Sequence, residues 1–277
     1  MGQPLPADYV ALESIESAAF ADLYRAAPEA IRTALRIDVT NIAGVTCLSC
    51  AQLQPPMIFR RACGLGVESP LRAAQLESVL RHMDGLGESY AVAVTPHAEP
   101  REIPDWLEAR GYTRGYAFMK FSRSTSASAD APTDLEVALV GPERADAFAR
   151  VISAGFGLPE IVAGWLARLP GRDDWICLLA SADGVPAAAA VAYVKGPHAW
   201  FGLGATLPPF RQRGGQSALL ARRLREAAAR GASVAVTETG ERLPDRPSNS
   251  YRNILRCGFE ERYLRQNYMS PGVRRAG

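Results

Sequence analysis

The chain has 277 residues, of which 48% are hydrophobic and 22% are charged, a balance typical of a globular protein with enough core for two domains. Its formal net charge is only +2, so its charge gives no argument for a nucleic-acid partner. No apolar run approaches the roughly 20 residues of a membrane span, and the acidic start of the chain does not resemble a secretion signal, so we expect a cytoplasmic protein.

Hydrophobic periodicity divides the first half of the chain into helices and strands. Helices are predicted over 15–35, 70–82 and 103–110, and strands over 45–52, 57–63, 90–95 and 112–121. Cys47 and Cys50 have the spacing of a redox or zinc motif, but a second ligand pair is missing and the chain has only three histidines. We therefore expect ordinary strand thiols and no metal site. The odd total of five cysteines fits a reducing compartment.

A small, polar stretch from Ser122 to Thr133 lacks apolar periodicity and predicts a linker. Two motifs recur in the same order on either side of it. One is Gly64-Leu65-Gly66 with Pro70, which returns as Gly202-Leu203-Gly204 with Pro208. The other is the segment from Trp106 to Tyr116, which returns from Asn253 to Tyr263. The recurrence predicts two copies of one fold.

The second half shows a similar succession of elements. Strands are predicted over 135–140, 175–180, 187–194, 199–206 and 232–239, and helices over 142–153, 160–168, from about Gln216, and over 250–259. Asp183-Gly184 predicts a hairpin turn between the second and third of these strands. Four arginines, Arg222, Arg223, Arg225 and Arg230, are expected on the solvated face of the helix that follows Gln216.

The most informative stretch lies between the strand over 199–206 and this helix. Gly214 and Gly215 let the backbone come close to a ligand. A helix that begins there aims its unpaired N–H groups and the positive end of its dipole at the same spot. The stretch therefore predicts an anion site, although glycines also close such turns for structural reasons alone.

The residues of this turn resemble the acyl-CoA loop of the GNAT superfamily of N-acetyltransferases. They are Arg211-Gln212-Arg213-Gly214-Gly215-Gln216, preceded by Thr206-Leu207-Pro208 and followed by Ser217. Gln216 departs from the family pattern, which most often has Gly or Ala there. Either its amide donates to a phosphate, or the pyrophosphate sits differently. The order of strand, loop, helix, strand, helix and Gly258-Phe259 is also that of the superfamily.

The resemblance implies an α/β (α+β) fold of two tandem GNAT-like domains, each a mixed, mostly antiparallel sheet flanked by helices. Residues 1–123 would form a degenerate copy, because no glycine follows Pro70 to admit a pyrophosphate. Residues 124–133 would be the linker, and residues 134–277 the acyltransferase domain.

The resemblance also implies that an acetyl group passes directly from acetyl-CoA to an amine of a small molecule or peptide, in a ternary complex. The residues expected to bind the acetyl-CoA are Ala205, Thr206, Leu207, Arg211, Gln212, Arg213, Gly214, Gly215, Gln216, Ser217, Asn249 and Asn253. The two asparagines lie where family members place an amide against the cofactor, and each is equally suited to cap the helix.

Catalysis needs an oxyanion donor and a base for the amine proton. The N–H near Leu203 would be the donor, and Gly202 and Gly204 either permit its close approach or mark a bulge. Glu238 is the preferred base and Glu241 a weaker one, the alternative being a solvent-facing carboxylate. Ile254 replaces the tyrosine that relatives often use as general acid, so Tyr251 and Tyr263 are either substitutes or core residues.

A second hypothesis is a non-catalytic acyl-CoA-binding or regulatory module. A nucleotide-triphosphate enzyme is disfavoured, because no Lys-Ser/Thr pair follows the two glycines. The acceptor and the oligomeric state are not determined, and a homodimer stays open. Specificity is expected to depend on the loops over 155–164 and 242–249.

Overall fold

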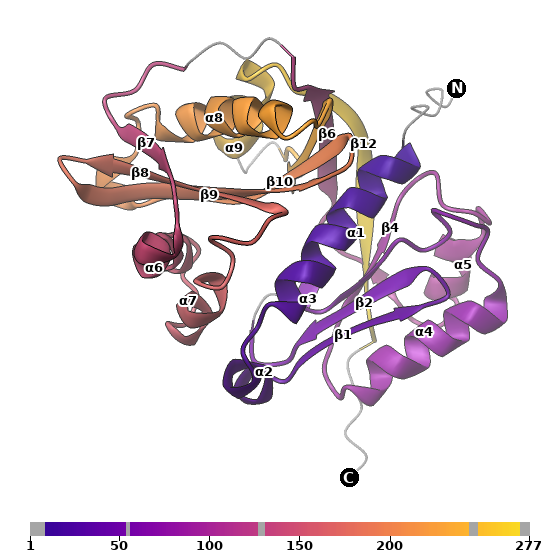
Figure 1. The fold of residues 1–277 in the computed structure, drawn as a ribbon. Helices are drawn as coiled ribbons and strands as arrows, with labels where there is room; N and C mark the ends of the chain where they lie inside the picture. The colour runs from indigo at the N-terminus through magenta and orange to yellow at the C-terminus, as the bar shows by residue number, and fades with distance from the viewer. Residues whose placement is uncertain (1–8, 54–55, 127–130, 244–248, 272–277) are drawn as a thin grey trace. The chain divides into compact units, whose positions relative to one another are not determined.

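The computed structural model describes residues 9–53, 56–126, 131–243 and 249–271 (Figure 1). These residues gather into two compact units. The first contains residues up to Arg25, Arg32–Met119 and the residues from Arg262 on, and the second contains Ala26–Ile31 and Lys120–Glu261.

The first unit is a mixed sheet with helices. Its elements include α1 (Tyr9–Arg25), β1 (Ile37–Ile42), β2 (Val45–Cys50), α3 (Pro56–Phe59), β3 (Arg61–Cys63), α4 (Ala73–Gly85), β4 (Ala91–Val94), α5 (Ile103–Glu108) and β5 (Thr113–Arg114). The sheet order is β1-β2-β3-β4-β12, where β12 (Glu260–Met269) comes from the end of the chain and also pairs with β5. Only β3 and β4 run parallel among the pairs for which a register is given.

Two predictions for this unit were wrong. The helix predicted over 15–35 is two helices, because the chain breaks at Pro28 before α2 (Glu29–Leu35). The strand predicted over 57–63 is α3 followed by the short β3. The turn between them is held by the buried Arg60, whose guanidinium donates to the carbonyls of Ala51 and Leu53, both at 2.9 Å.

The side chains of β2 alternate between two faces of the sheet. Val45 and Cys47 belong to the hydrophobic core that the sheet forms with α4 and α5, whereas Thr46 lines a groove against α1. Helices therefore cover both faces of this sheet.

A network of buried charges lies in the first unit, between α1 and the strands. Arg265 donates to Glu13 at 3.0 Å and to Glu16 at 2.7 Å, and Arg61 donates to Glu16 at 3.0 Å. The hydroxyl of Tyr263 donates to Glu13 at 2.7 Å. The side chains of the four charged residues are at most 2% exposed, so the ion pairs are almost completely shielded from water.

The second unit repeats the plan. Its elements are β6 (Phe118–Ser124), β7 (Glu136–Leu139), a 3-10 turn over Pro142–Arg144, α6 (Ala145–Gly155), α7 (Ile161–Leu166), β8 (Trp175–Ala182), β9 (Val185–Lys195), β10 (His198–Thr206), a 3-10 turn over Pro208–Phe210, α8 (Gly215–Ala229), β11 (Val234–Gly240) and α9 (Asn249–Arg256). The sheet order is β6-β11-β10-β9-β8-β7. α8 and α9 lie on one side of it and α6 and α7 on the other (Figure 1), which explains why β8 is buried along its whole length.

Both units end a run of antiparallel strands with a parallel pair joined by a helix. In the first unit β3 and β4 are joined through α4, and in the second β10 and β11 are joined through α8. The predicted hairpin turn at Asp183-Gly184 is confirmed, with positive φ at both residues, 48° and 80°. The predicted fold class, a mixed and mostly antiparallel sheet flanked by helices in each of two copies, is confirmed.

The compact units differ from the predicted boundaries at two strands. The strand predicted over 112–121 is divided into β5 and β6, and β6 lies beside β11 in the sheet of the second unit. β12, which falls inside the predicted domain over 134–277, pairs with β4 in the first unit. The unit to which each of these strands belongs is determined by strand pairing, which the local sequence does not indicate. Of the predicted linker, residues 127–130 lie outside the described residues.

Cys47 and Cys50 are free, buried thiols of β2, in agreement with the predicted strand thiols. Burial raises the pKa of each thiol to about 12, which leaves very little reactive thiolate at neutral pH. Across the described residues, no group of three or more metal-ligating side chains is found. Within the described ranges, no helix is long and apolar enough to cross a bilayer.

Candidate functional site

The parallel strands β10 and β11 separate halfway along their length. Their pairing runs from His198 opposite Val234 to Phe201 opposite Thr237 and then stops, although the strands continue to Thr206 and Gly240. On its other side, β10 loses its register with β9 between Gly202 and Ala205. Leu203, inside this bulge, has a φ of 48°, which non-glycine residues rarely adopt. An opening between the two strands therefore begins at the bulge.

The two glycines of the bulge, Gly202 and Gly204, differ in whether local packing requires a glycine. A Cβ on Gly202 would lie 2.0 Å from Cη2 of the Trp200 side chain, so packing alone requires glycine there. A Cβ on Gly204 would meet nothing closer than 3.8 Å, which is an ordinary contact. Gly204 lines the cleft described below, whereas Gly202 is not part of that lining.

The chain then turns into α8 with an uncapped helix end. Gln212 and Gly214 have positive φ, 65° and 76°, and Gly214 is the residue before the helix. The N–H of Ala218 makes the first backbone bond of the helix, to Gly214 at 3.0 Å, and no side chain caps the end. The first-turn N–H groups therefore have no helix carbonyl to bind, and the positive end of the helix dipole faces the same way. This arrangement favours an anion.

Packing behind the turn also requires the two glycines. A Cβ on Gly214 would lie 2.2 Å from the carbonyl oxygen of Pro132, and one on Gly215 would lie 2.9 Å from Leu135. The hydroxyl of Thr133 donates to the carbonyl of Arg213 at 2.7 Å. The segment before β7 therefore fixes the turn from behind, and its front stays open.

A cleft of about 750 Å³ lies in front of the turn, and its residues come from β10, the turn, α8, α9 and the end of α6. Ten of the predicted cofactor-binding residues line it, namely Ala205, Thr206, Arg211, Gln212, Gly214, Gly215, Gln216, Ser217, Asn249 and Asn253. Leu207 and Arg213 are absent from the lining. Arg213 points its guanidinium at Asp134 instead, at 2.5 Å in an exposed ion pair.

The cleft also contains residues that the sequence prediction missed. They are Gly155, Phe156, Gly204, Phe210, Ser250, Arg252 and Arg256. Arg252 and Arg256 are one turn apart on α9 and share its cleft side with Asn249 and Asn253, a spacing that could have revealed them. With Arg211, they give the cleft three cationic side chains.

Gln216, the residue that departs from the family pattern, is held by α9. Its side-chain oxygen accepts from Asn253 at 2.6 Å, and its side-chain nitrogen donates to the hydroxyl of Ser250 at 3.4 Å. These bonds join the start of α8 to the face of α9 that lines the cleft. They also give Asn253 a role other than helix capping.

Glu238, the predicted base, lies on β11 one residue beyond the last pair with β10, and it is not among the residues that line the cleft. Its carboxylate is 3.5 Å from the ammonium of Lys120 on β6, and the two side chains are 13% and 0% exposed. The sequence prediction missed Lys120. The weaker candidate Glu241 follows β11 directly, outside the cleft lining as well.

The tyrosines considered as substitutes for the general acid are core residues bound to carboxylates. Tyr251 donates to Glu261 at 2.6 Å, and burial raises the pKa of its hydroxyl to about 12. Tyr263 belongs to the first unit, where it donates to Glu13, and burial raises its pKa as well. Ile254 is buried.

The equivalent place in the first unit is closed. The N–H of Glu99 donates to the carbonyl of Gly66 at 2.9 Å, and the N–H of Leu71 donates to the carbonyl of Glu99 at 2.8 Å. A Cβ on Gly66 would lie 2.1 Å from the Glu99 carbonyl oxygen, so main chain fills this space. The side chain of Gln75 caps the N–H of Arg72 at the start of α4. The start of α4 is therefore capped by a side chain of its own first turn, whereas no side chain caps the start of α8.

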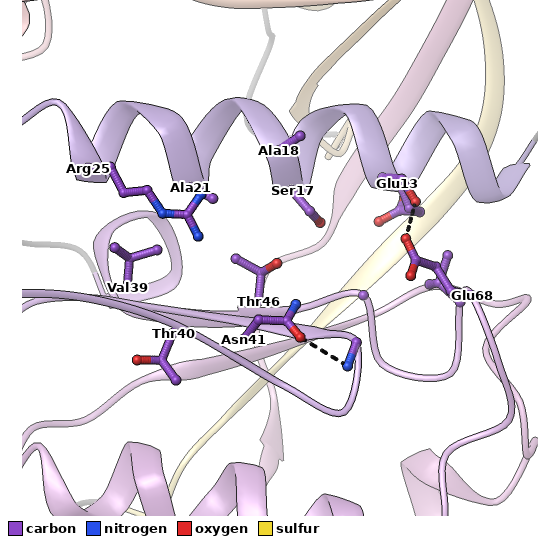
Figure 2. Close-up of a pocket in the computed structure, with 14 residues that line it drawn as sticks. Glu13, Ser17, Ala18, Ala21, Arg25, Val39, Thr40, Asn41, Thr46 and Glu68 are labelled. Carbon is purple, nitrogen blue, oxygen red and sulfur yellow. Dashed lines mark hydrogen bonds between the residues drawn. The ribbon is translucent and has the colours of Figure 1, made fainter. Parts of the chain in front are cut away.

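A smaller groove of about 230 Å³ lies in the first unit, between α1 and the β1–β2 hairpin. Figure 2 shows Arg25 at one end, Glu68 at the other, and Ser17, Asn41 and Thr46 between them. None of the predicted site residues belongs to it.

The sequence of the chain matches no protein-family model and no curated protein. Solved structures do share its fold over most of its length. A GCN5-related N-acetyltransferase from Kribbella flavida has a TM-score of 0.62 at 19% identity, with 91% of this chain and 95% of that chain covered. A tandem GNAT protein from the clavulanic acid biosynthesis pathway has a TM-score of 0.60 at 13% identity, with 94% and 96% covered.

A GCN5-related N-acetyltransferase from Sphaerobacter thermophilus has a TM-score of 0.59 at 15% identity, with 86% of this chain and 77% of that chain covered. Likeness at these identities establishes the fold. The chain therefore has the tandem fold of GCN5-related N-acetyltransferases, and the resemblance in its glycine turn is matched by its architecture.

Proposed function

We propose that the chain is an acetyl-CoA-dependent N-acetyltransferase whose second unit binds the acetyl-CoA and carries out the transfer. The observation that carries this proposal is the cleft of the second unit, which runs from the uncapped start of α8 to the bulge in β10. Support also comes from the shared fold, since the proteins that share it are named as N-acetyltransferases.

The residues present fit an acyl-CoA. The first-turn amides of α8 would bind the pyrophosphate, and Arg211, Arg252 and Arg256 would add charge for its phosphates. The part of the cleft beside Gly204, Ala205 and Thr206 would hold the pantetheine. The opening between β10 and β11 would then receive the thioester, which is the acyl donor.

In the proposed reaction the nitrogen of a neutral amine forms a bond with the acyl carbon, the carbon–sulfur bond breaks, and the thiolate leaves with its electron pair. The N–H of Leu203 would donate to the thioester oxygen as charge develops on it. Glu238 would take the proton that the amine nitrogen loses, through water, because its side chain is outside the cleft lining. Holding the two substrates together supplies a further part of the rate enhancement.

One observation favours a second candidate, an acyl-CoA-binding or regulatory module. Glu238 is engaged by Lys120 and stands apart from the cleft, so binding could occur without a base to promote turnover. Gly155 and Phe156 of the predicted specificity loop line the cleft, whereas residues 244–248 of the other predicted loop lie outside the described residues.

The test combines calorimetry with a turnover assay. Purified protein is titrated with CoA, then incubated with acetyl-CoA and a panel of amines while free CoA is detected with a thiol reagent. CoA binding with amine-dependent release of CoA supports the enzyme, and binding without release across the panel supports the binding module. Absence of CoA binding contradicts both.

Two variants, one inside the cleft and one outside it, show whether binding occurs in this cleft. Arg252→Gln combined with Arg256→Gln removes two cleft cations, and we expect about tenfold weaker CoA binding, which corresponds to about 1.4 kcal/mol. Arg150→Gln removes an exposed cation of α6 that is not part of the cleft lining and should leave the affinity unchanged. Equal affinities of these variants would place the binding site elsewhere.

A further inference from the structure

Arg223 on α8 is buried directly beneath the bulge of β10. It was expected on the solvated face of this helix, but only 4% of it is exposed, so that expectation was wrong for this residue. Its Nη1 atom donates to the carbonyl of Val191 on β9 at 3.0 Å and to the carbonyl of Gly202 on β10 at 3.3 Å. The guanidinium therefore joins the two strands where their regular pairing ends.

Main-chain carbonyls are its hydrogen-bond partners in the described part of the chain. Besides the two strand carbonyls, its Nε atom donates to Leu219 at 3.2 Å within α8. The guanidinium also lies 4.9 Å from the ring centroid of Phe201, which provides a cation–π contact. Burial lowers the pKa of Arg223 to about 9, so the side chain remains mostly protonated at neutral pH. The bulge is therefore built over a retained positive charge.

The bond to Gly202 determines the direction of a second group. The carbonyl of Gly202 and the N–H of Leu203 belong to one trans peptide unit, in which they point in opposite directions. Because Arg223 holds the carbonyl on the side of β9, the N–H of Leu203 points away from β9. β11 is the neighbour on that side, and its pairing with β10 has already ended at Phe201. Leu203 has no partner in the register of either neighbouring strand.

We propose that Arg223 is a positioning residue for the acyl transfer, which orients the N–H of Leu203 toward the opening between β10 and β11. This inference rests on the proposed function. The positive charge at the carbonyl also polarises the peptide and makes its N–H a stronger donor to the thioester oxygen. Arg223 itself contacts no reacting atom in this account. It acts through the peptide unit between Gly202 and Leu203.

A positioning role of Arg223 and a purely folding role predict different experimental results. A folding role predicts that its loss lowers stability and reduces CoA binding and turnover together. A positioning role predicts that CoA binding survives, because the turn over 211–217 is fixed by residues 132–135 and by α9. It also predicts that turnover falls, because the donor is then no longer aimed.

The first experiment compares the wild type with Arg223→Met, Arg223→Lys and the neighbouring control Arg222→Met, whose side chain pairs with Glu226. For Arg223→Met we expect a kcat about 100-fold lower, as for loss of an oxyanion donor, with KM for acetyl-CoA and the Kd for CoA within about threefold of wild type. Arg223→Lys should recover part of kcat. Arg222→Met should match the wild type. A kcat within twofold of wild type in Arg223→Met overturns the inference, as does a parallel loss of CoA affinity.

The second experiment does not depend on turnover. The protein is labelled with 15N-leucine, the Leu203 amide is assigned by its loss in Leu203→Met, and its resonance is followed as CoA or acetyl-CoA is added. In the wild type, acetyl-CoA should shift this amide further than CoA, which has no thioester oxygen. In Arg223→Met the two ligands should give the same shift. An undiminished difference in Arg223→Met overturns the inference even if CoA binds, and failure of both ligands to bind the wild type contradicts the proposed function itself.

Discussion

Replacing Gly214 by alanine tests whether the turn before α8 is the anion site. Gly214 has a φ of 76°, and an alanine Cβ would lie 2.2 Å from the carbonyl oxygen of Pro132. A left-handed conformation costs an L-residue about 1–2 kcal/mol. Carbon–oxygen contacts are normally about 3.3 Å or more, so the turn must also move by about 1 Å. Such a shift would displace the first-turn N–H groups from the phosphates.

Gly231 at the far end of α8 provides the matched control. It has a φ of 88°, but a Cβ there would meet nothing within 4 Å, so Gly231→Ala carries the backbone strain without the collision. Each variant should lose at least about 1–2 kcal/mol of stability, with the larger fall in Tm for Gly214→Ala. By calorimetry, CoA affinity should fall at least about tenfold in Gly214→Ala and stay within about twofold of wild type in Gly231→Ala. If the two variants bind CoA equally well, the turn is not the site.

Four further predictions concern other parts of the chain. Glu238→Gln should lower kcat about 100-fold with little change in the KM for acetyl-CoA, while Glu241→Gln stays near wild type; equal rates in both variants would remove Glu238 from the role of base. Arg265→Met should cost about 3–5 kcal/mol in denaturant unfolding, because it leaves Glu13 and Glu16 buried with one cation fewer; a loss below about 1 kcal/mol would contradict this. Native protein should react with a thiol reagent mainly at Cys257, because this thiol is partly exposed whereas the other four are buried. Burial also raises the pKa of Cys47 and Cys50 to about 12. The pKa of Cys47 and Cys50 is lower in the unfolded chain, about 9, than in the folded protein, about 12. Their contribution to the free energy of unfolding should therefore be full below about pH 9 and decline as the pH rises toward 12. Unfolding curves measured at several pH values would show or refute this decline.

The sequence predicted the elements of the second unit more accurately than those of the first. Strands such as β8, β9 and β10 are continuous apolar runs with clear turn residues between them, so their local signals agree with their burial. In the first unit, β1 was missed and the segment over 57–63 was misassigned. There, short elements are held by contacts between distant residues, such as Arg60 with the carbonyl of Ser89, 29 positions away.

The candidate site was predicted where it depends on one continuous segment. The turn over 211–217 carries its own glycines and the start of its own helix, so ten of the predicted binding residues line a single cleft. Arg252 and Arg256 were missed, because α9 meets the cleft only through the packing of α8 and α9. Arg213 has the right position in the motif, yet Asp134 holds its side chain elsewhere.

The sequence by itself determined the two copies, the order of their elements and the glycine turn, because these features depend on periodicity and on the φ angles that glycine allows. Only the tertiary structure decided that β12 completes the sheet of the first unit, that main chain closes the equivalent space beside Gly66, and that Arg223 lies under the bulge. Each of these outcomes depends on which of several distant segments of the chain pack or pair with one another. The free energy of this packing or pairing comes from the burial and hydrogen bonding of both partners together, which neither segment reveals alone.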